Sequence, residues 1–182
     1  GPPDPLWSRG LGDVYKRQMN GGYRYAPSTR VYMQFQNRFW ENESLNGWGN
    51  SDIPEEIWQP TWDLSGPTGI IMSYLRWTPA ENMDALSEQE RINYVLNRWE
   101  NIFPGATNNL ESGVSQSWAQ EEWSQGAWAS PTSSQDAALA SYIGLAEGRI
   151  HFAGEHASDD RGWMQGALFS GLRAATEIKE AN

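Results

Sequence analysis

Apolar and polar side chains alternate most clearly between residues 29 and 36 of the chain. Val31, Met33 and Phe35 hold the apolar positions of this segment. Because successive side chains of a strand point to opposite faces, a period of two predicts a strand with one buried face. Other short apolar runs, one of them directly after the breaker Gly66-Pro67, predict further strands at residues 69–75, 113–116 and 149–153.

A helical period follows Ser87. The apolar side chains recur every three or four residues and mark one face of a helix: Ile92, Val95, Leu96, Trp99 and Ile102. Ser87 and Glu90 form a capping box at its start, and Pro104-Gly105 ends it. Thr78 is expected to cap an earlier helix that has Pro79 in its first turn. Residues 127–135, rich in Ser, Pro and Thr, are expected to form a loop.

The last expected helix starts near Trp163 or Met164 and runs to about Lys179. It has a stripe of small residues beside an apolar face: Ala167, Ser170, Gly171 and Ala174, then Leu168, Leu172 and Ala175. Glycine is costly inside a helix, so Gly166 and Gly171 predict that a neighbour packs closely there. Strands and helices in mixed order indicate an α+β or mixed α/β fold.

Composition narrows the class of protein. The chain has 182 residues and a net charge of -10, which disfavours nucleic acid as a partner because phosphates require clustered Lys and Arg. Cysteine is absent and only two histidines occur, so no metal site is expected. No apolar run approaches the roughly 20 residues that span a bilayer, and no signal peptide is visible. The sequence leaves open whether the protein is cytoplasmic or exported. It also leaves open whether the protein forms a homo-oligomer.

Residues 1–18 differ in character from the rest. The segment is rich in Pro and Gly, and Met19 follows it. Its residues 8–18 resemble the translation of an adapter used in sequencing libraries. We therefore expect a non-native leader at 1–18 and a metagenomic fragment of a longer protein, with a natural extension as the alternative.

Three linked motifs carry the candidate chemistry: residues 148–156, 161–167 and 170–175. A glycine at the end of a strand lets the backbone approach a bulky anionic group, and a helix amino terminus offers free N–H donors. Together these motifs resemble the C-terminal signature of flavin-dependent amine oxidases, which include monoamine, polyamine and L-amino-acid oxidases. The resemblance extends back to about Ala26 through Phe39-Trp40 and Trp118.

The resemblance implies a domain organisation. Residues 19–147 would belong to the substrate-binding domain, and 148–182 would be the C-terminal strand and helix of a Rossmann-like FAD-binding domain. That domain would be incomplete, because the family's N-terminal dinucleotide-binding part is missing. Residues 19–182 alone should then bind FAD weakly or not at all. Ala127 stands where monoamine oxidases have the cysteine that binds flavin, which implies non-covalent FAD.

The same resemblance assigns cofactor contacts. Gly154 would close on the diphosphate, and Glu155 would accept from a ribose hydroxyl or a backbone N–H. The backbone at Met164 and Gln165 would stabilise the reduced flavin. The complete set of expected cofactor-binding residues is Gly154, Glu155, Gly162, Trp163, Met164, Gln165 and Ala167.

Trp128 and Trp163 match the family's two aromatic residues that flank the substrate amine; the alternative is that both are core aromatics. Arg30 replaces the family's usual Lys, which holds a water and assists reoxidation by oxygen. It could still orient water, bind a substrate carboxylate, mark slowed or lost oxidase chemistry, or be a solvated side chain. Glu111 falls at about the position where amino-acid oxidases of the family have a tyrosine that binds the substrate carboxylate. A carboxylate there would repel an amino acid's carboxylate, which favours a cationic amine.

The activity implied is oxidation of an amine to an imine, with O2 reduced to H2O2. Three alternatives remain open. An L-amino-acid oxidase of the same family is one, and an inactive flavoprotein-like scaffold is another. A carbohydrate-binding module is the third, because 11 Trp could stack on sugar rings.

Overall fold

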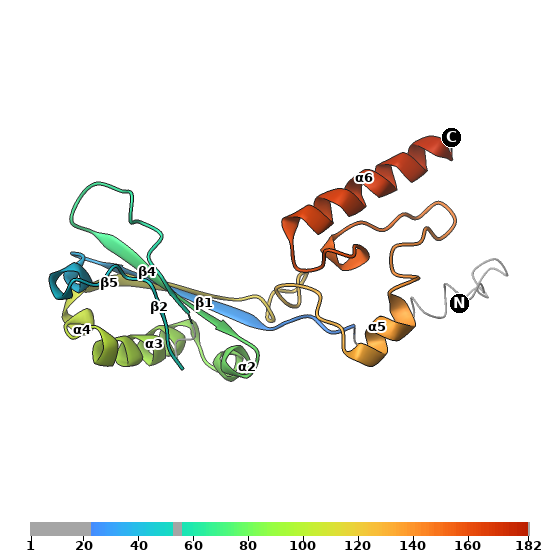
Figure 1. The fold of residues 1–182 in the computed structure, drawn as a ribbon. Coiled ribbons are helices and arrows are strands. Elements are labelled where there is room, and N and C mark those ends of the chain that lie inside the picture. The colour runs from blue at the N-terminus through green and yellow to red at the C-terminus, as the bar shows by residue number, and fades with distance from the viewer. Residues whose placement is uncertain (1–22, 53–55, 182) are drawn as a thin grey trace. The chain divides into compact units, whose positions relative to one another are not determined.

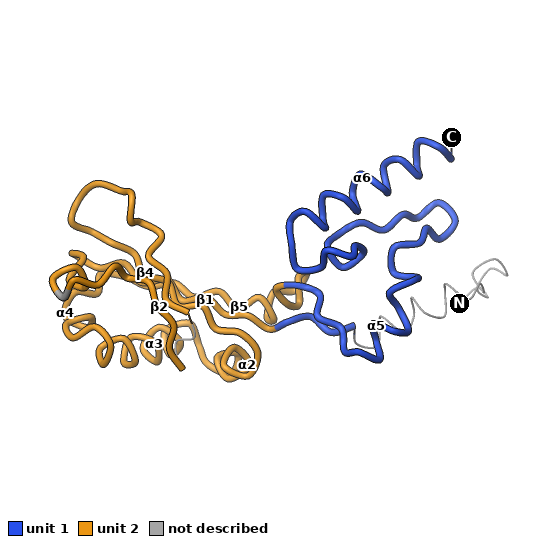
Figure 2. The backbone as a smooth tube through the Cα atoms, in the orientation of Figure 1, with its two compact units in different colours: residues 1–26, 128–182 blue, residues 27–127 orange. Residues whose placement is uncertain are grey.

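The structure is a computed structural model that describes residues 23–52 and 56–181. The expected leader at 1–18 lies outside the described residues. The chain divides into two compact units (Figure 2). Unit 2 is residues 27–127, and unit 1 joins residues 128–182 with the chain before Pro27.

Unit 2 is built on one antiparallel sheet of five strands in the order β2-β3-β4-β1-β5 (Figure 1). The strands are β1 (Ser28–Phe35), β2 (Gly49–Asn50), β3 (Glu56–Trp58), β4 (Gly69–Arg76) and β5 (Leu110–Ser117). Three of the four strands expected from the sequence are confirmed. In the register of the sheet, Arg30 lies opposite Tyr74 of β4 and Gln116 of β5.

Helices cover one face of this sheet (Figure 1). They are α2 (Thr78–Asp84), α3 (Glu88–Ile102) and the short α4 (Ala106–Asn109), while a 3-10 turn, η2 (Phe39–Glu43), follows β1. The apolar positions of β1 pack against α3, where the ring of Phe35 stacks on Trp99 with centroids 5.9 Å apart. The alternation in β1 therefore leaves Arg30, Tyr32 and Gln34 on the opposite face.

Sequence expectations for the helices of unit 2 hold with two corrections. The capping box at Ser87 is confirmed, and four of the five apolar positions of α3 are buried. Ile102, the last residue of α3, is exposed, and the next residue, Phe103, is buried in the core in its place. Thr78 is not a cap: the helix begins at Thr78 itself, and Trp77 precedes it with a φ of 57°. The Trp77 N–H donates to Pro27 O, so the turn from β4 into α2 is fixed by backbone.

Unit 1 contains α5 (Ser133–Leu139), a 3-10 turn η3 (Glu155–Ala157) and the long α6 (Met164–Glu180). The expected C-terminal helix is confirmed. The loop expected over 127–135 ends sooner, because Thr132 and Gln135 form a capping box that starts α5.

The strand expected at 149–153 is wrong. Within the described residues this segment forms only an isolated bridge between Glu147 and Ile150. Side chains of α6 bind its backbone in place of a neighbouring strand: Arg173 donates to Phe152 O, and Ser170 Oγ bonds both the N–H and the carbonyl of Gly154. A strand requires a ladder partner, and the described part of unit 1 supplies none.

The boundary expected at residues 147 and 148 lies inside unit 1. Arg173 donates to Gly144 O across it, and Glu155 accepts from Ala129 N–H. The assignment of these segments to a substrate-binding and an FAD-binding domain stays a prediction. Among the helices of the described chain, none has the length and apolarity needed to cross a membrane.

Candidate functional site

Two tryptophan-bearing segments of unit 1 meet at Glu155. One carboxylate oxygen accepts the Ala129 N–H at 2.7 Å, and the other accepts the Gly162 N–H at 2.7 Å. Ala129 follows Trp128, and Gly162 precedes Trp163. The carboxylate thus links the backbones beside both tryptophans. Of the two partners expected for Glu155, these contacts use the backbone N–H.

Trp128 lies against Gly162. A Cβ atom added at Gly162, which has a φ of 78°, would stand 3.5 Å from Trp128 Cδ1. Trp128 is half-buried, whereas Trp163 is 70% exposed. The Trp128 segment is itself fixed, because Ala26 N–H donates to Trp128 O at 2.8 Å. The structure therefore brings the backbone segments of the two expected substrate-flanking residues together, and Trp163 is not a core aromatic.

The start of α6 is open. Trp163 occupies the N-cap position without a side-chain cap, and the first turn has no acidic residue. Met164 is 84% exposed and Gln165 is exposed, while Ala167 is half-buried. The first N–H groups of a helix have no intrahelical acceptor and carry partial positive charge. This 17-residue helix can therefore receive an anionic group beside Trp163.

Gly154 has a local reason to be glycine. Its φ is 144°, and an added Cβ would lie 2.4 Å from Cε1 of the His156 ring. Burial lowers the pKa of His156, and the Glu155 carboxylate partly opposes this shift. The positive φ and the nearby His156 ring both favour glycine here, and the expected contact of Gly154 with a diphosphate stays a prediction.

The two glycines of α6 have different surroundings. A Cβ at Gly166 would lie 2.1 Å from the Asp160 carbonyl oxygen, which confirms the close neighbour expected there. No atom lies within 4 Å of a Cβ built at Gly171, so the same expectation is wrong for that residue. Leu168 and Leu172, on the adjoining apolar face, are exposed at 71% and 67%.

Arg30 lies in unit 2, on the sheet face away from the helices. Its guanidinium carbon is 4.4 Å from the centroid of the Tyr74 ring and 5.8 Å from that of Trp58. Arg30 Nη1 also donates to the Tyr32 hydroxyl at 3.5 Å. Burial lowers the pKa of Arg30, but bonds and charge interactions with Tyr32 and Tyr74 outweigh it and leave the pKa raised. Arg30 is therefore half-buried in an aromatic setting and is not a solvated side chain.

Glu111 does not lie next to Arg30. Its carboxylate accepts from Gln34 Nε2 at 2.8 Å, beside an irregularity in the pairing of β1 and β5. Gln34 is four positions from Arg30, or roughly 13 Å along the strand. The cross-strand neighbours of Arg30 are Tyr74 and Gln116. Sequence reasoning missed both, because alternation gives the face of a residue but only the pairing register gives its cross-strand neighbours.

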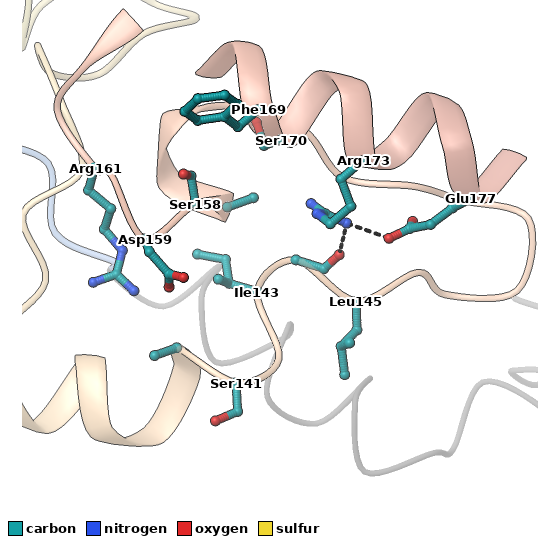
Figure 3. A pocket seen from close by; sticks show the side chains of 13 residues that line it. Ser141, Ile143, Leu145, Ser158, Asp159, Arg161, Phe169, Ser170, Arg173 and Glu177 are labelled. Atoms are coloured by element: carbon teal, nitrogen blue, oxygen red, sulfur yellow. Dashed lines mark hydrogen bonds and ion pairs between the residues drawn. The ribbon is translucent and has the colours of Figure 1, made fainter. Parts of the chain in front are cut away.

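Unit 1 also contains a pocket of about 310 Å³ beside α6 (Figure 3). Arg173 reaches from α6 to Gly144 O and Glu177, and Arg161 pairs with Asp136 at 2.6 Å. The residues that line the pocket are Ala140, Ser141, Ile143, Gly144, Leu145, Ala157, Ser158, Asp159, Arg161, Phe169, Ser170, Arg173 and Glu177. None of the site residues expected from the sequence lines this pocket.

Two tryptophan-bearing segments, linked through Glu155 beside an open helix start, define a class of site suited to a flat anionic cofactor and an apolar or cationic substrate. The sequence model of the family described as flavin containing amine oxidoreductase matches residues 3–179. The chain belongs to this family of flavin-dependent amine oxidases, whose members act on amines and use O2. Family membership decides against the carbohydrate-binding module.

Known proteins are similar in sequence to most of this chain. YobN of Bacillus subtilis (strain 168) is 38% identical over 170 residues, which cover 90% of this chain and 35% of that protein. The L-amino-acid oxidase of Siganus canaliculatus is 31% identical over 174 residues, which cover 92% of this chain and 33% of that protein. The chain thus spans about a third of the length of these relatives.

Solved structures show the same fold. Cyclohexylamine oxidase from Brevibacterium oxydans IH-35A matches with a TM-score of 0.79 and 19% identity, over 92% of this chain and 38% of that one. An A394C mutant of putrescine oxidase matches with a TM-score of 0.80 and 22% identity, over the same shares of the two chains.

Proposed function

We propose that this chain is part of a longer FAD-dependent oxidase that converts amines to imines. The single observation that carries the proposal is the arrangement around Glu155. It joins the segments of Trp128 and Trp163 directly before the uncapped start of α6. The chain's coverage of only about a third of its relatives supports a longer protein.

The residues of unit 1 suit non-covalent FAD. The free N–H groups at Met164 and Gln165 would hold the part of the flavin where negative charge develops. Gly154, Glu155, Gly162 and Ala167 would complete the binding segment, and Ala127 offers no atom for a covalent bond. When bound, FAD supplies the two-electron oxidation of the carbon next to the amine.

The chain's own aromatic residues act on the substrate. Trp128 and Trp163 would exclude water from the amine and orient its reacting carbon, and their π faces would attract a charged ammonium. Arg30 contacts Tyr32 and Tyr74, and these contacts favour one orientation of its guanidinium. It would order a water through its N–H donors, but it cannot accept a proton as a neutral lysine amine can.

An L-amino acid is the second candidate substrate, and a specific observation favours it. Within the described residues, no carboxylate lies within ion-pair distance of Arg30. A substrate carboxylate could therefore form an ion pair with the Arg30 guanidinium. The L-amino-acid oxidases among the relatives favour the same substrate class. Glu111, which is exposed, favours a cationic amine instead.

The test is a peroxide-coupled screen of amines and L-amino acids on the full-length protein encoded by the gene. Absorbance of the purified protein measures bound flavin. We expect a flavin spectrum and peroxide release with at least one amine, whereas a protein without flavin would refute the function. Turnover of L-amino acids alone would decide for the second candidate if Arg30→Gln abolishes it. Gln36→Glu, a charge change at an exposed residue that follows the same strand, is the control and should retain it.

Arg30→Lys tests the remaining question about oxygen. If Arg30 slows reoxidation, Lys at this position should speed the return of reduced flavin to its oxidised form in stopped-flow absorbance. A protein that binds flavin but turns over no substrate with either residue would be the inactive scaffold.

A further inference from the structure

Glu155 uses its whole carboxylate to bind backbone. Both of its oxygens accept a backbone N–H, each at 2.7 Å, from segments 33 residues apart in the chain: Ala129 and Gly162. Each partner is the immediate neighbour of a tryptophan. The carboxylate therefore sets the separation of two backbone segments.

The link suits a carboxylate in particular. An ionised carboxylate has two acceptor oxygens and no donor, so it satisfies two converging N–H groups at once. Bonds from backbone N–H to a charged oxygen are about twice as strong as bonds between neutral groups. Glutamine has one acceptor oxygen, and its amide would place a donor against the second N–H. A glutamine at this position could therefore hold only one of the two segments.

An ion pair also joins neighbouring parts of these two segments, but it acts through side chains at both ends. Arg161 pairs with Asp136 at 2.6 Å, through side chains that are 22% and 47% exposed. A flexible side-chain pair allows the backbone to shift, whereas the bonds of Glu155 fix the backbone itself. Gly162 has a φ of 78°, a conformation that glycine adopts readily, so the bond from Glu155 adds a restraint at a flexible residue.

We infer that Glu155 is a positioning residue that holds Trp128 and Trp163 at a fixed separation for the substrate. This role rests on the proposed function, because it presumes that the two indoles flank the reacting amine. It differs from a direct contact between Glu155 and FAD. Losing the link should impair the reaction with substrate while the protein keeps its flavin.

The first test measures the two N–H groups directly. Hydrogen exchange of the Ala129 and Gly162 amides is followed by NMR in the 182-residue chain. Both amides should be protected in the wild-type chain, and an unprotected pair there would overturn the inference without any variant. Glu155→Gln should speed exchange at one amide by roughly tenfold to hundredfold, and Glu155→Ala should do so at both. Glu180→Gln, at the exposed end of α6, is the matched control and should leave both unchanged.

The second test uses the full-length flavin-loaded protein. Glu155→Gln should keep its bound flavin, measured by absorbance, while kcat/KM for the amine falls roughly tenfold to hundredfold. Loss of flavin with both amides still protected would show a direct cofactor contact and overturn the inference. Exposed amides with unchanged kcat/KM would also overturn it. A wild-type protein without flavin would instead refute the proposed function. The amide exchange would then still test whether Glu155 holds the two backbone segments.

Discussion

Gly166→Ala should destabilise the chain even though alanine favours helices. Gly166 lies in the first turn of α6, where its Cα faces the segment that leads into the helix. An added Cβ would stand 2.1 Å from Asp160 O, 2.8 Å from Asp160 C and 3.0 Å from Ser158 Oγ. Two of these three atoms are backbone, so no rotation of a side chain relieves the contact.

The cost follows from the packing. The Asp160 backbone cannot retreat freely, because its N–H donates to Ser158 Oγ and the N–H of Gly162 is bound by Glu155. Overpacking of this kind costs typically 1–3 kcal/mol. The helix preference of alanine returns at most about 1 kcal/mol. Because the clash is with backbone, we expect a net loss of about 2 kcal/mol.

Gly171→Ala is the matched control in the same helix. Its added Cβ meets no atom within 4 Å, so only the helix preference acts and stability should rise by about 0.5–1 kcal/mol. The two variants should differ by about 3 kcal/mol. For a chain of this length that difference is roughly 6–12 °C in Tm, measured by far-UV circular dichroism. If Gly166→Ala melts at or above Gly171→Ala, the packing argument is refuted.

Three further predictions concern other parts of the chain, each measured by urea unfolding. Trp99→Ala removes a fully buried ring and should cost about 3–5 kcal/mol, whereas Trp123→Ala, at a side chain 88% exposed, should change stability by less than about 0.5 kcal/mol; equal effects would contradict the core assignment. Ser87→Ala should cost about 1 kcal/mol by removing the cap of α3, and no change relative to the exposed-loop variant Ser124→Ala would argue against the capping box. Burial lowers the pKa of His156, so as pH falls through about 6.5 the unfolded chain binds a proton that the folded chain does not, and stability should fall. His156→Gln should reduce this decline between pH 7 and 5, and an unaltered pH profile would refute the role of His156.

The candidate site was only partly predictable. Motif resemblance pointed to Trp128, Trp163 and the start of α6, and all three lie in one unit. The sequence could not decide between a ribose hydroxyl and a backbone N–H as the partner of Glu155, because both can donate a hydrogen bond to a carboxylate. Tyr74 and Gln116 were missed as neighbours of Arg30, because the register between strands far apart in the chain determines which residues lie opposite each other.

By itself the sequence determined the elements whose causes are local. Alternation placed β1, and the apolar period with a capping box placed α3, because both signals act between residues a few positions apart. The tertiary structure alone decided the rest. Residues 149–153 have the composition of a strand but find no ladder partner in the described part of unit 1, and α6 binds the backbone of Phe152 and of the following Gly154 instead. Gly166 and Gly171 look alike in the sequence of one helix, yet the path of the chain at Asp160 leaves no room for a side chain at the first, while a Cβ at the second meets no atom within 4 Å.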